Sequence, residues 1–179
     1  MRADARRNYE RLLREARAAF AESGVEASLE DIARRAGVGI GTLYRHFPTR
    51  DALLEALLRD GFDALAARAR DAPGTRDALA AWALALMESS TAYRGLTTAF
   101  ITTLRDESTE LYASCKALNA AGSDLLARAQ RAGEIRPDVD APEFLTMVYG
   151  IAWADEQARG GRTERLLGLL LDGLRPPRP

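Results

Sequence analysis

Apolar residues recur along this 179-residue chain at the spacing of an α-helix, and this periodicity constrains the fold more than any other feature. Leu12, Ala16, Ala19 and Phe20, for example, fall on one helical stripe. No segment sustains the apolar–polar alternation of a β-strand, and β-branched residues form few clusters. The sequence therefore predicts an all-α fold of about nine helices, with three small helices at the N-terminus and a larger helical bundle after them.

Capping residues and Gly or Pro breaks mark where the predicted helices begin and end. Ser28 and Asp140 each precede an acidic residue three positions on, an arrangement that caps helix N-termini. Gly37 can take the left-handed conformation that ends a helix. The first predicted helix ends near residue 24, and the next two cover about 29–36 and 40–47. The fourth begins after Thr49, and the fifth follows a break at 71–75. The last four cover about 93–104, 109–132, 141–159 and 163–172.

Charge is distributed unevenly along the chain. Residues 1–50 contain ten Arg and seven acidic residues, a net charge of +3, whereas residues 51–179 carry −4. A mildly basic head on an acidic body is consistent with a nucleic-acid contact at one end only. Asp155 and Glu156 are expected to belong to a solvated or dimer-facing acidic patch.

Cysteine and histidine are too scarce for several kinds of site. Cys115 is the single cysteine and His46 the single histidine, so we expect no disulfide within the chain, no thiolate zinc site and no Cys–His pair. No Ser–His–Asp arrangement or glycine-rich phosphate loop is indicated either. We therefore expect no enzyme activity, metal or cofactor. A lone thiol, no signal peptide and no long apolar stretch favour a cytoplasmic protein.

Residues 28–47, SLEDIARRAGVGIGTLYRHF, match the helix-turn-helix pattern, in which a tight turn joins two short helices. Gly37 lies at the expected turn. In the second helix, Leu43, Phe47 and Ile40 share the side expected to be buried. The second helix of such a motif enters the major groove of DNA.

The opposite side of this short helix carries groups suited to a DNA groove. Arg45 and Gly41 face directly away from the predicted core. Arg can bind a guanine edge bidentately, hydroxyl groups can donate to phosphate, and Gly lets the backbone approach closely. A short surface helix that is merely polar is the alternative interpretation. The residues flanking Arg45 and Gly41 are Thr42, Tyr44 and His46.

From about Asn8 to Leu58 the sequence resembles the DNA-binding domain of the TetR family of bacterial transcriptional regulators. GTLYRHF, followed by a basic residue and a leucine-rich helix, carries the most specific part of the resemblance. Its C-terminal segments, GEIRPDVD, GIAWA and RLLGLLLDGLRP, are similar to those of many actinobacterial members. The resemblance implies a homodimer with a DNA-binding domain over residues 1–50, a linking fourth helix from about residue 50, and a ligand-binding and dimerisation domain over residues 51–179.

The family motif implies a role for each matching residue. Arg50 would hold phosphate at the N-terminus of the fourth helix, and Ser28 would cap the second helix or donate to phosphate. Gly39 departs from the small polar residue often found there, which removes a helix cap and a phosphate contact expected from that residue. Ile40 either touches a thymine methyl or fills the edge of the core. Groove-edge or phosphate contacts are expected from Thr42, Tyr44 and His46, and base contacts from Ile40, Gly41 and Arg45.

The middle helices are expected to hold an effector pocket, because they combine aromatic and hydroxyl groups with few charges. Ordinary core packing is the alternative for each residue. The candidates are Trp82, Met87, Tyr93, Thr97, Phe100, Tyr112, Asn119 and Trp153.

The last two predicted helices carry apolar stripes that could form a four-helix bundle across a two-fold axis. The alternative is that these side chains only close the core of the subunit. The candidates are Phe144, Val148, Ile151, Leu166, Leu167 and Leu170.

Together these expectations describe a ligand-responsive transcriptional regulator, most simply a repressor. It would bind an inverted-repeat operator in double-stranded DNA as a homodimer, and a small apolar or amphipathic effector would release it. No membrane partner is expected. A helical ligand-binding protein with degenerate DNA binding is the alternative.

Overall fold

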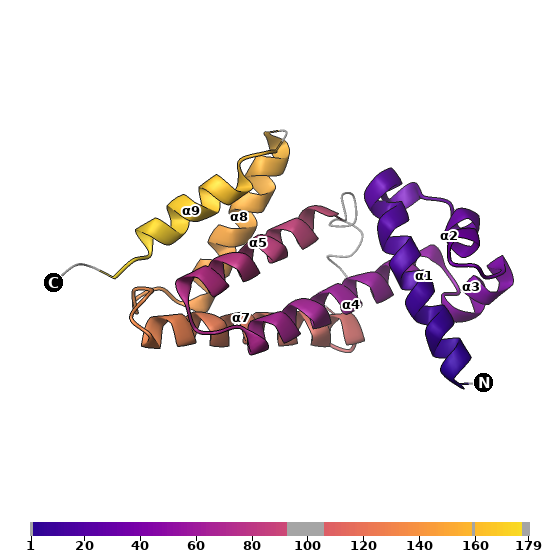
Figure 1. Cartoon of the computed structure of the whole chain (residues 1–179), viewed down its shortest axis with the longest axis horizontal. Helices are drawn as coiled ribbons and strands as arrows, with labels where there is room; N and C mark the ends of the chain where they lie inside the picture. The colour runs from indigo at the N-terminus through magenta and orange to yellow at the C-terminus, as the bar shows by residue number, and fades with distance from the viewer. Residues whose placement is uncertain (1, 93–105, 159, 177–179) are drawn as a thin grey trace. The chain divides into compact units, whose positions relative to one another are not determined.

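The computed structural model describes residues 2–92, 106–158 and 160–176 (Figure 1). These ranges contain eight α-helices, one short 3-10 helix and no strand, which confirms the all-α prediction. The expected helix over residues 93–104 lies outside the described residues. None of the described helices has the length and apolar character needed to cross a membrane.

Two compact units divide the chain, and their boundary falls within α4 (Arg50–Asp71), between Gly61 and Phe62. The first unit contains α1 (Arg2–Ser23), the 3-10 helix η1 (Gly24–Glu26), α2 (Leu29–Arg35), α3 (Ile40–His46), the start of α4, and the described residues 106–113. The second contains the rest of α4, most of α5 (Arg76–Ala92) and of α7 (Glu110–Arg131), and all of α8 (Ala141–Gln157) and α9 (Thr163–Gly173).

Helix starts follow the capping signals of the sequence. The Ser28 hydroxyl accepts a hydrogen bond from the Asp31 amide at 3.2 Å, and the Thr49 hydroxyl accepts one from the Ala52 amide at 3.0 Å. Asp140 and Glu143 form a reciprocal capping box at the start of α8. These side chains satisfy amide groups that the first turn of a helix leaves without partners.

In the first unit, α2 packs on both α1 and α3. The core that joins the helices is apolar, because one stripe of each helix turns inward. Its buried side chains include Leu12, Ala16 and Phe20 of α1, Leu29 and Ile32 of α2, Leu43 of α3, and Leu53 and Leu57 of α4.

The second unit is organised around a continuous buried cluster from α4, α5, α7, α8 and α9. Trp82 of α5 is one of its largest members, and its indole N–H donates to the Leu65 carbonyl at 3.0 Å. Its ring lies against Gly122 of α7, where a Cβ atom would fall 2.4 Å from Cη2 of the indole. Glycine at this position therefore lets α5 and α7 approach each other closely.

A buried carboxylate joins α8 to α9. Asp155 accepts hydrogen bonds from the Thr163 amide at 3.0 Å, the Thr163 hydroxyl at 2.5 Å and the Arg162 amide at 3.2 Å. The bond from the Thr163 hydroxyl, helped by these amides and by the charge of Arg162, lowers the pKa of Asp155. The expectation of a solvated or dimer-facing patch is therefore wrong for Asp155, because its carboxylate is turned inward to the first turn of α9.

Candidate nucleic-acid interface

The helix-turn-helix forms as the sequence predicts. Gly37 has φ +66°, the left-handed conformation that ends α2 and reverses the chain. The Val38 amide donates to the Ala33 carbonyl at 3.0 Å, which closes the turn. At the start of α3, Gly39 occupies the cap position without a side-chain hydrogen bond, so the expected loss of a cap at this residue is confirmed.

Burial divides α3 into the two sides that helical periodicity predicts. Leu43 and Phe47 are buried, whereas Gly41 and Arg45 are exposed. A Cβ atom at Gly41 would meet no atom within 4 Å, so the space in front of it is open. Ile40 is 36% exposed and therefore does not fill the core, which favours the outward alternative for this residue.

The polar groups of α3 are arranged along its outer surface. Arg45 Nε donates to the Gly41 carbonyl and its Nη2 donates to Thr42 Oγ1, both at 3.1 Å. Because a guanidinium carries five N–H groups, these two bonds orient it and leave other donors for a ligand. Tyr44 is 45% exposed, and Thr42 is half-buried.

His46 lies at the edge of the face rather than on its outer surface. The imidazole is half-buried, with its ring centroid 6.0 Å from that of Tyr9 on α1 in an edge-on arrangement. The Tyr9 ring also lies 5.2 Å from the Phe47 ring. Tyr9 therefore anchors the end of α3. Periodicity alone could not identify this role, because the contact joins residues that are far apart in the sequence.

Arg50 and Ser28 are brought close together at the N-termini of α4 and α2. Arg50 Nη1 donates to the Ala27 carbonyl at 2.6 Å, directly before Ser28 in the chain. This bond holds the start of α4 beside the start of α2. Two helix N-termini, each with a partial positive charge, thus lie next to a guanidinium, an arrangement that suits an anion such as phosphate.

One ion pair connects α2 to α1, and two others lie within α2. Arg35 donates to Glu22 of α1 at 2.9 Å and to Asp31 at 2.8 Å, while Arg34 also pairs with Asp31. The hydrogen bond from Arg34 is the main cause that lowers the pKa of Asp31, with a smaller contribution from Arg35. Arg34 is mostly exposed, and the sequence analysis did not single it out.

The predicted effector residues do not converge on one hollow among the described residues. Trp82 and Met87 are buried in the core of the second unit, whereas Trp153 is 67% exposed. Tyr112 is half-buried, and its hydroxyl donates to Glu107 at 3.2 Å. Asn119 is also half-buried, and it donates to Cys115 Sγ at 3.8 Å. Tyr93, Thr97 and Phe100 lie outside the described residues.

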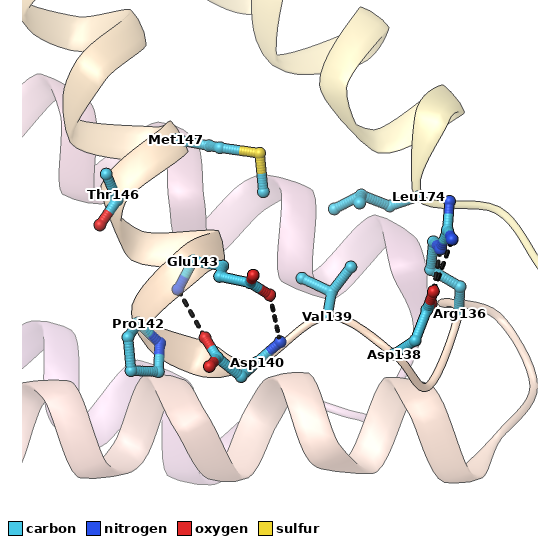
Figure 2. A pocket seen from close by; sticks show the side chains of 9 residues that line it. All are labelled: Arg136, Asp138, Val139, Asp140, Pro142, Glu143, Thr146, Met147 and Leu174. Atoms are coloured by element: carbon cyan, nitrogen blue, oxygen red, sulfur yellow. Dashed lines mark hydrogen bonds and ion pairs between the residues drawn. The ribbon is translucent and has the colours of Figure 1, made fainter.

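The described residues of the second unit line a larger and a smaller hollow. The larger, of about 640 Å³, lies where the N-terminal end of α8 meets the C-terminal end of α9 (Figure 2). The smaller, of about 280 Å³, is lined by residues that include Met87, Glu88 and Thr163. Met87 is the one predicted effector residue that lines either of these two hollows.

The predicted dimer residues turn mostly toward the core of their own unit. Phe144, Val148 and Leu167 are fully buried there. Ile151, Leu166 and Leu170 are half-buried. For the three buried residues the alternative interpretation therefore applies, in which the side chains close the core of the subunit.

Five large apolar or aromatic side chains are exposed among the described residues, two in the first unit and three in the second. Ile40 and Tyr44 lie on α3, while Tyr149, Trp153 and Leu169 lie on α8 and α9. The sequence analysis missed Tyr149 and Leu169, because the helical stripes point to the buried side of each helix.

Comparison with known proteins agrees with this geometry. Residues 12–57 match the family model for bacterial regulatory proteins of the tetR family, and residues 72–176 match the model for the C-terminal domain of SbtR-like transcriptional regulators. The second match alone covers more than half of the chain. The chain belongs to the TetR family. It is thus a TetR-family transcriptional regulator, with the fold of a DNA-binding protein.

Solved structures of other TetR regulators share the fold over almost the whole chain. A TetR transcriptional regulator from Streptomyces coelicolor is 36% identical, with a TM-score of 0.76 over 94% of this chain and 99% of that one. A TetR regulator from Mycobacterium vanbaalenii is also 36% identical, with a TM-score of 0.75 over 98% and 99% of the two chains. These actinobacterial relatives fit the resemblance of the C-terminal segments.

A curated relative is a repressor. The transcriptional repressor KstR2 of Mycobacterium tuberculosis is 46% identical over 61 residues, which cover 34% of this chain and 30% of KstR2. The sequence match therefore spans less than a third of that relative. The structure of KstR2, described as a ketosteroid transcriptional regulator, has a TM-score of 0.61 over 96% of both chains at 26% identity.

Proposed function

We propose that this TetR-family regulator is a ligand-responsive repressor that binds an inverted-repeat operator as a homodimer. The observation that carries the proposal is the face of α3. Leu43 and Phe47 anchor one side of a seven-residue helix, and the opposite side presents Arg45 and Tyr44 around the open space at Gly41. A helix this short contributes little to a core and is suited to presenting side chains to a groove.

In the proposed complex, α3 enters the major groove and its outer residues read the bases. Arg45 would bind guanine O6 and N7, and Ile40 would contact a thymine methyl. Tyr44 and Thr42 would donate to phosphate at the groove edge, with His46 beside them. Arg50 and Ser28, at the adjoining N-termini of α4 and α2, would hold a further phosphate.

The homodimer would be formed by the outward surfaces of α8 and α9. A single three-helix head makes few contacts, so two heads are needed for specific affinity. The support comes from the exposed Tyr149, Trp153 and Leu169, which form an apolar surface of the kind that marks a protein interface. In this proposal the N-terminal head binds DNA, and the C-terminal unit dimerises and binds the effector.

Release of the operator would follow from binding of a small apolar or amphipathic effector by the C-terminal unit. Such an effector need only bind the DNA-incompetent state more tightly than the competent one. α4 is the element suited to this coupling, because it begins at the phosphate-binding Arg50 and continues to Asp71.

Selection of bound sequences from random duplex DNA with the purified protein tests the proposal. We expect an inverted repeat, and an affinity for it that falls steeply as salt rises because phosphate contacts release counterions. Equal, weak binding to every duplex would instead support the second candidate, a helical ligand-binding protein with degenerate DNA binding. The missing side-chain cap at Gly39 is the observation that favours this second candidate.

A further inference from the structure

An exposed side chain of α8, here called the knob, and a hollow both lie along this helix. The knob is Trp153, which at 67% exposure is the most exposed large apolar side chain among the described residues. The hollow, of about 640 Å³, borders the same helix nearer to its N-terminus. Thr146 and Trp153 are seven residues apart, so two turns of helix place them on the same face.

The hollow has an apolar floor and a charged rim, which carries the carboxylates of Asp138, Asp140 and Glu143 and the guanidinium of Arg136. Figure 2 shows Met147 of α8 and Leu174 at the end of α9 pointing toward each other, with Val139 beside them. At the rim, Glu143 accepts a hydrogen bond from the Asp140 amide at 3.0 Å and its own amide donates to Asp140 at 2.7 Å. The capping box uses one oxygen of each carboxylate, so the rim offers further acceptors.

Gly150 lies midway between the knob and the floor of the hollow. It is three residues from Trp153 and three from Met147, about 4.5 Å along the helix in each direction. A Cβ atom at Gly150 would meet nothing within 4 Å. Two copies of α8 could therefore cross closely at this glycine, and a two-fold axis there would exchange the knob with the hollow.

From this placement we infer that the second copy of the chain inserts its Trp153 into the hollow lined by Val139, Met147 and Leu174, and that the same contact is made in reverse. The inference rests on the homodimer proposed above and assigns its register. In a two-fold interface residue i contacts j and j contacts i, so a knob and a hollow on one face suffice for two identical contacts.

The chemistry of the indole matches the hollow. The ring is apolar and fits against the Met and Leu side chains, while its N–H is a donor that requires an acceptor once buried. Glu143 at the rim supplies a carboxylate oxygen for this purpose. Tyr149 is less suited to be the knob, because it is 39% exposed whereas Trp153 is 67% exposed.

Dilution of the purified full-length protein in an analytical ultracentrifuge tests the contact from both sides. We expect Trp153→Ala to raise the dimer dissociation constant at least tenfold, as for a buried aromatic anchor. Thr146→Trp, which places a bulky side chain at the edge of the hollow, should raise it similarly. Asp124→Ala is the control, because Asp124 is exposed on α7 rather than on α8; it should leave the constant unchanged.

Acrylamide quenching of tryptophan fluorescence gives a second readout, with Trp153→Phe supplying the signal of the buried Trp82 alone. The Trp153 signal should be quenched freely in dilute monomer and become protected on dimerisation. A dimer with freely quenched Trp153 and an unaltered dissociation constant for Trp153→Ala overturns the inference but leaves the homodimer standing. The inference is also overturned if Trp153 remains protected from acrylamide in the monomer, because a small molecule or the chain itself would then cover it. A monomer at every concentration overturns the homodimer as well.

Discussion

In the proposed complex, Arg45 would read the bases, whereas Arg50 would bind phosphate. Its guanidinium is held along α3 by Gly41 and Thr42, whereas Arg50 lies at the start of α4 beside the Ala27 carbonyl. We expect Arg45→Ala to cost about 1–3 kcal/mol against the selected operator and to relax the preference at one base pair in each half-site.

Arg50→Ala is the comparison variant for this prediction. It should weaken binding to all duplexes alike and reduce the slope of log affinity against log salt by about 1. Fluorescence anisotropy with the operator and with single-base variants measures both effects. If Arg45→Ala lowers affinity equally for every base variant, Arg45 does not read the bases.

Gly122 is the residue whose replacement should most disturb the C-terminal core. An added methyl group would lie 2.4 Å from the Trp82 ring, which is itself tied to the Leu65 carbonyl and cannot move freely. We expect Gly122→Ala to lower the free energy of unfolding by about 1–3 kcal/mol, as overpacking of a filled core does. Urea unfolding at fixed protein concentration measures this change.

Gly168→Ala is the matched control, because Gly168 is also within a helix but a Cβ atom there meets nothing within 4 Å. Alanine should raise the free energy of unfolding by about 0.5–1 kcal/mol at that position, since it is the better helix former. A Gly122→Ala variant as stable as the wild type would show that α5 and α7 are not closely packed at this point.

At the scale of elements, the joint between α8 and α9 depends on Asp155. Its bonds to Thr163 and Arg162 lower its pKa when folded, so the stabilisation is complete above the unfolded pKa of about 4 and is lost as pH falls through the folded value. We expect Asp155→Asn to lower the Tm at pH 7. The difference from wild type should shrink below about pH 4, where the wild-type carboxylate also becomes protonated.

Calorimetry from pH 3 to pH 8 measures this dependence. Asp138→Asn is the control, because Asp138 forms an exposed ion pair with Arg136 and exposed pairs contribute little to stability. If the Tm difference between Asp155→Asn and the wild type does not vary with pH, the charge of Asp155 does not stabilise the connection between α8 and α9.

Features that depend on neighbouring residues were predicted from the sequence, and features that depend on distant ones were not. The caps at Ser28 and Asp140 and the two sides of α3 are confirmed, because helical periodicity and capping involve residues within a few positions. The cap of α9 by Asp155, the anchor at Tyr9 and the exposed Trp153 required the packing of helices. An apolar stripe shows that a helix is amphipathic, but the packed structure is needed to show which residues lie outside the stripe and face a partner.

At the scale of the whole molecule, the proposed homodimer predicts how affinity depends on the spacing of the operator half-sites. Two α3 helices related by a two-fold axis must reach major grooves about 34–36 Å apart, close to one turn of DNA. An insertion of about 5 bp between the half-sites turns one of them to the opposite side of the duplex. We therefore expect this insertion to reduce the affinity to that of a single half-site.

Anisotropy titrations at one fixed salt concentration measure the effect, because non-specific binding varies strongly with salt. A duplex with one intact half-site and one scrambled half-site is the control, and it should bind as weakly as the spaced operator. Independent monomers would bind both half-sites of the spaced operator as well as those of the original. Equal affinity for the two operators would therefore contradict the homodimer, even if each half-site were read as proposed.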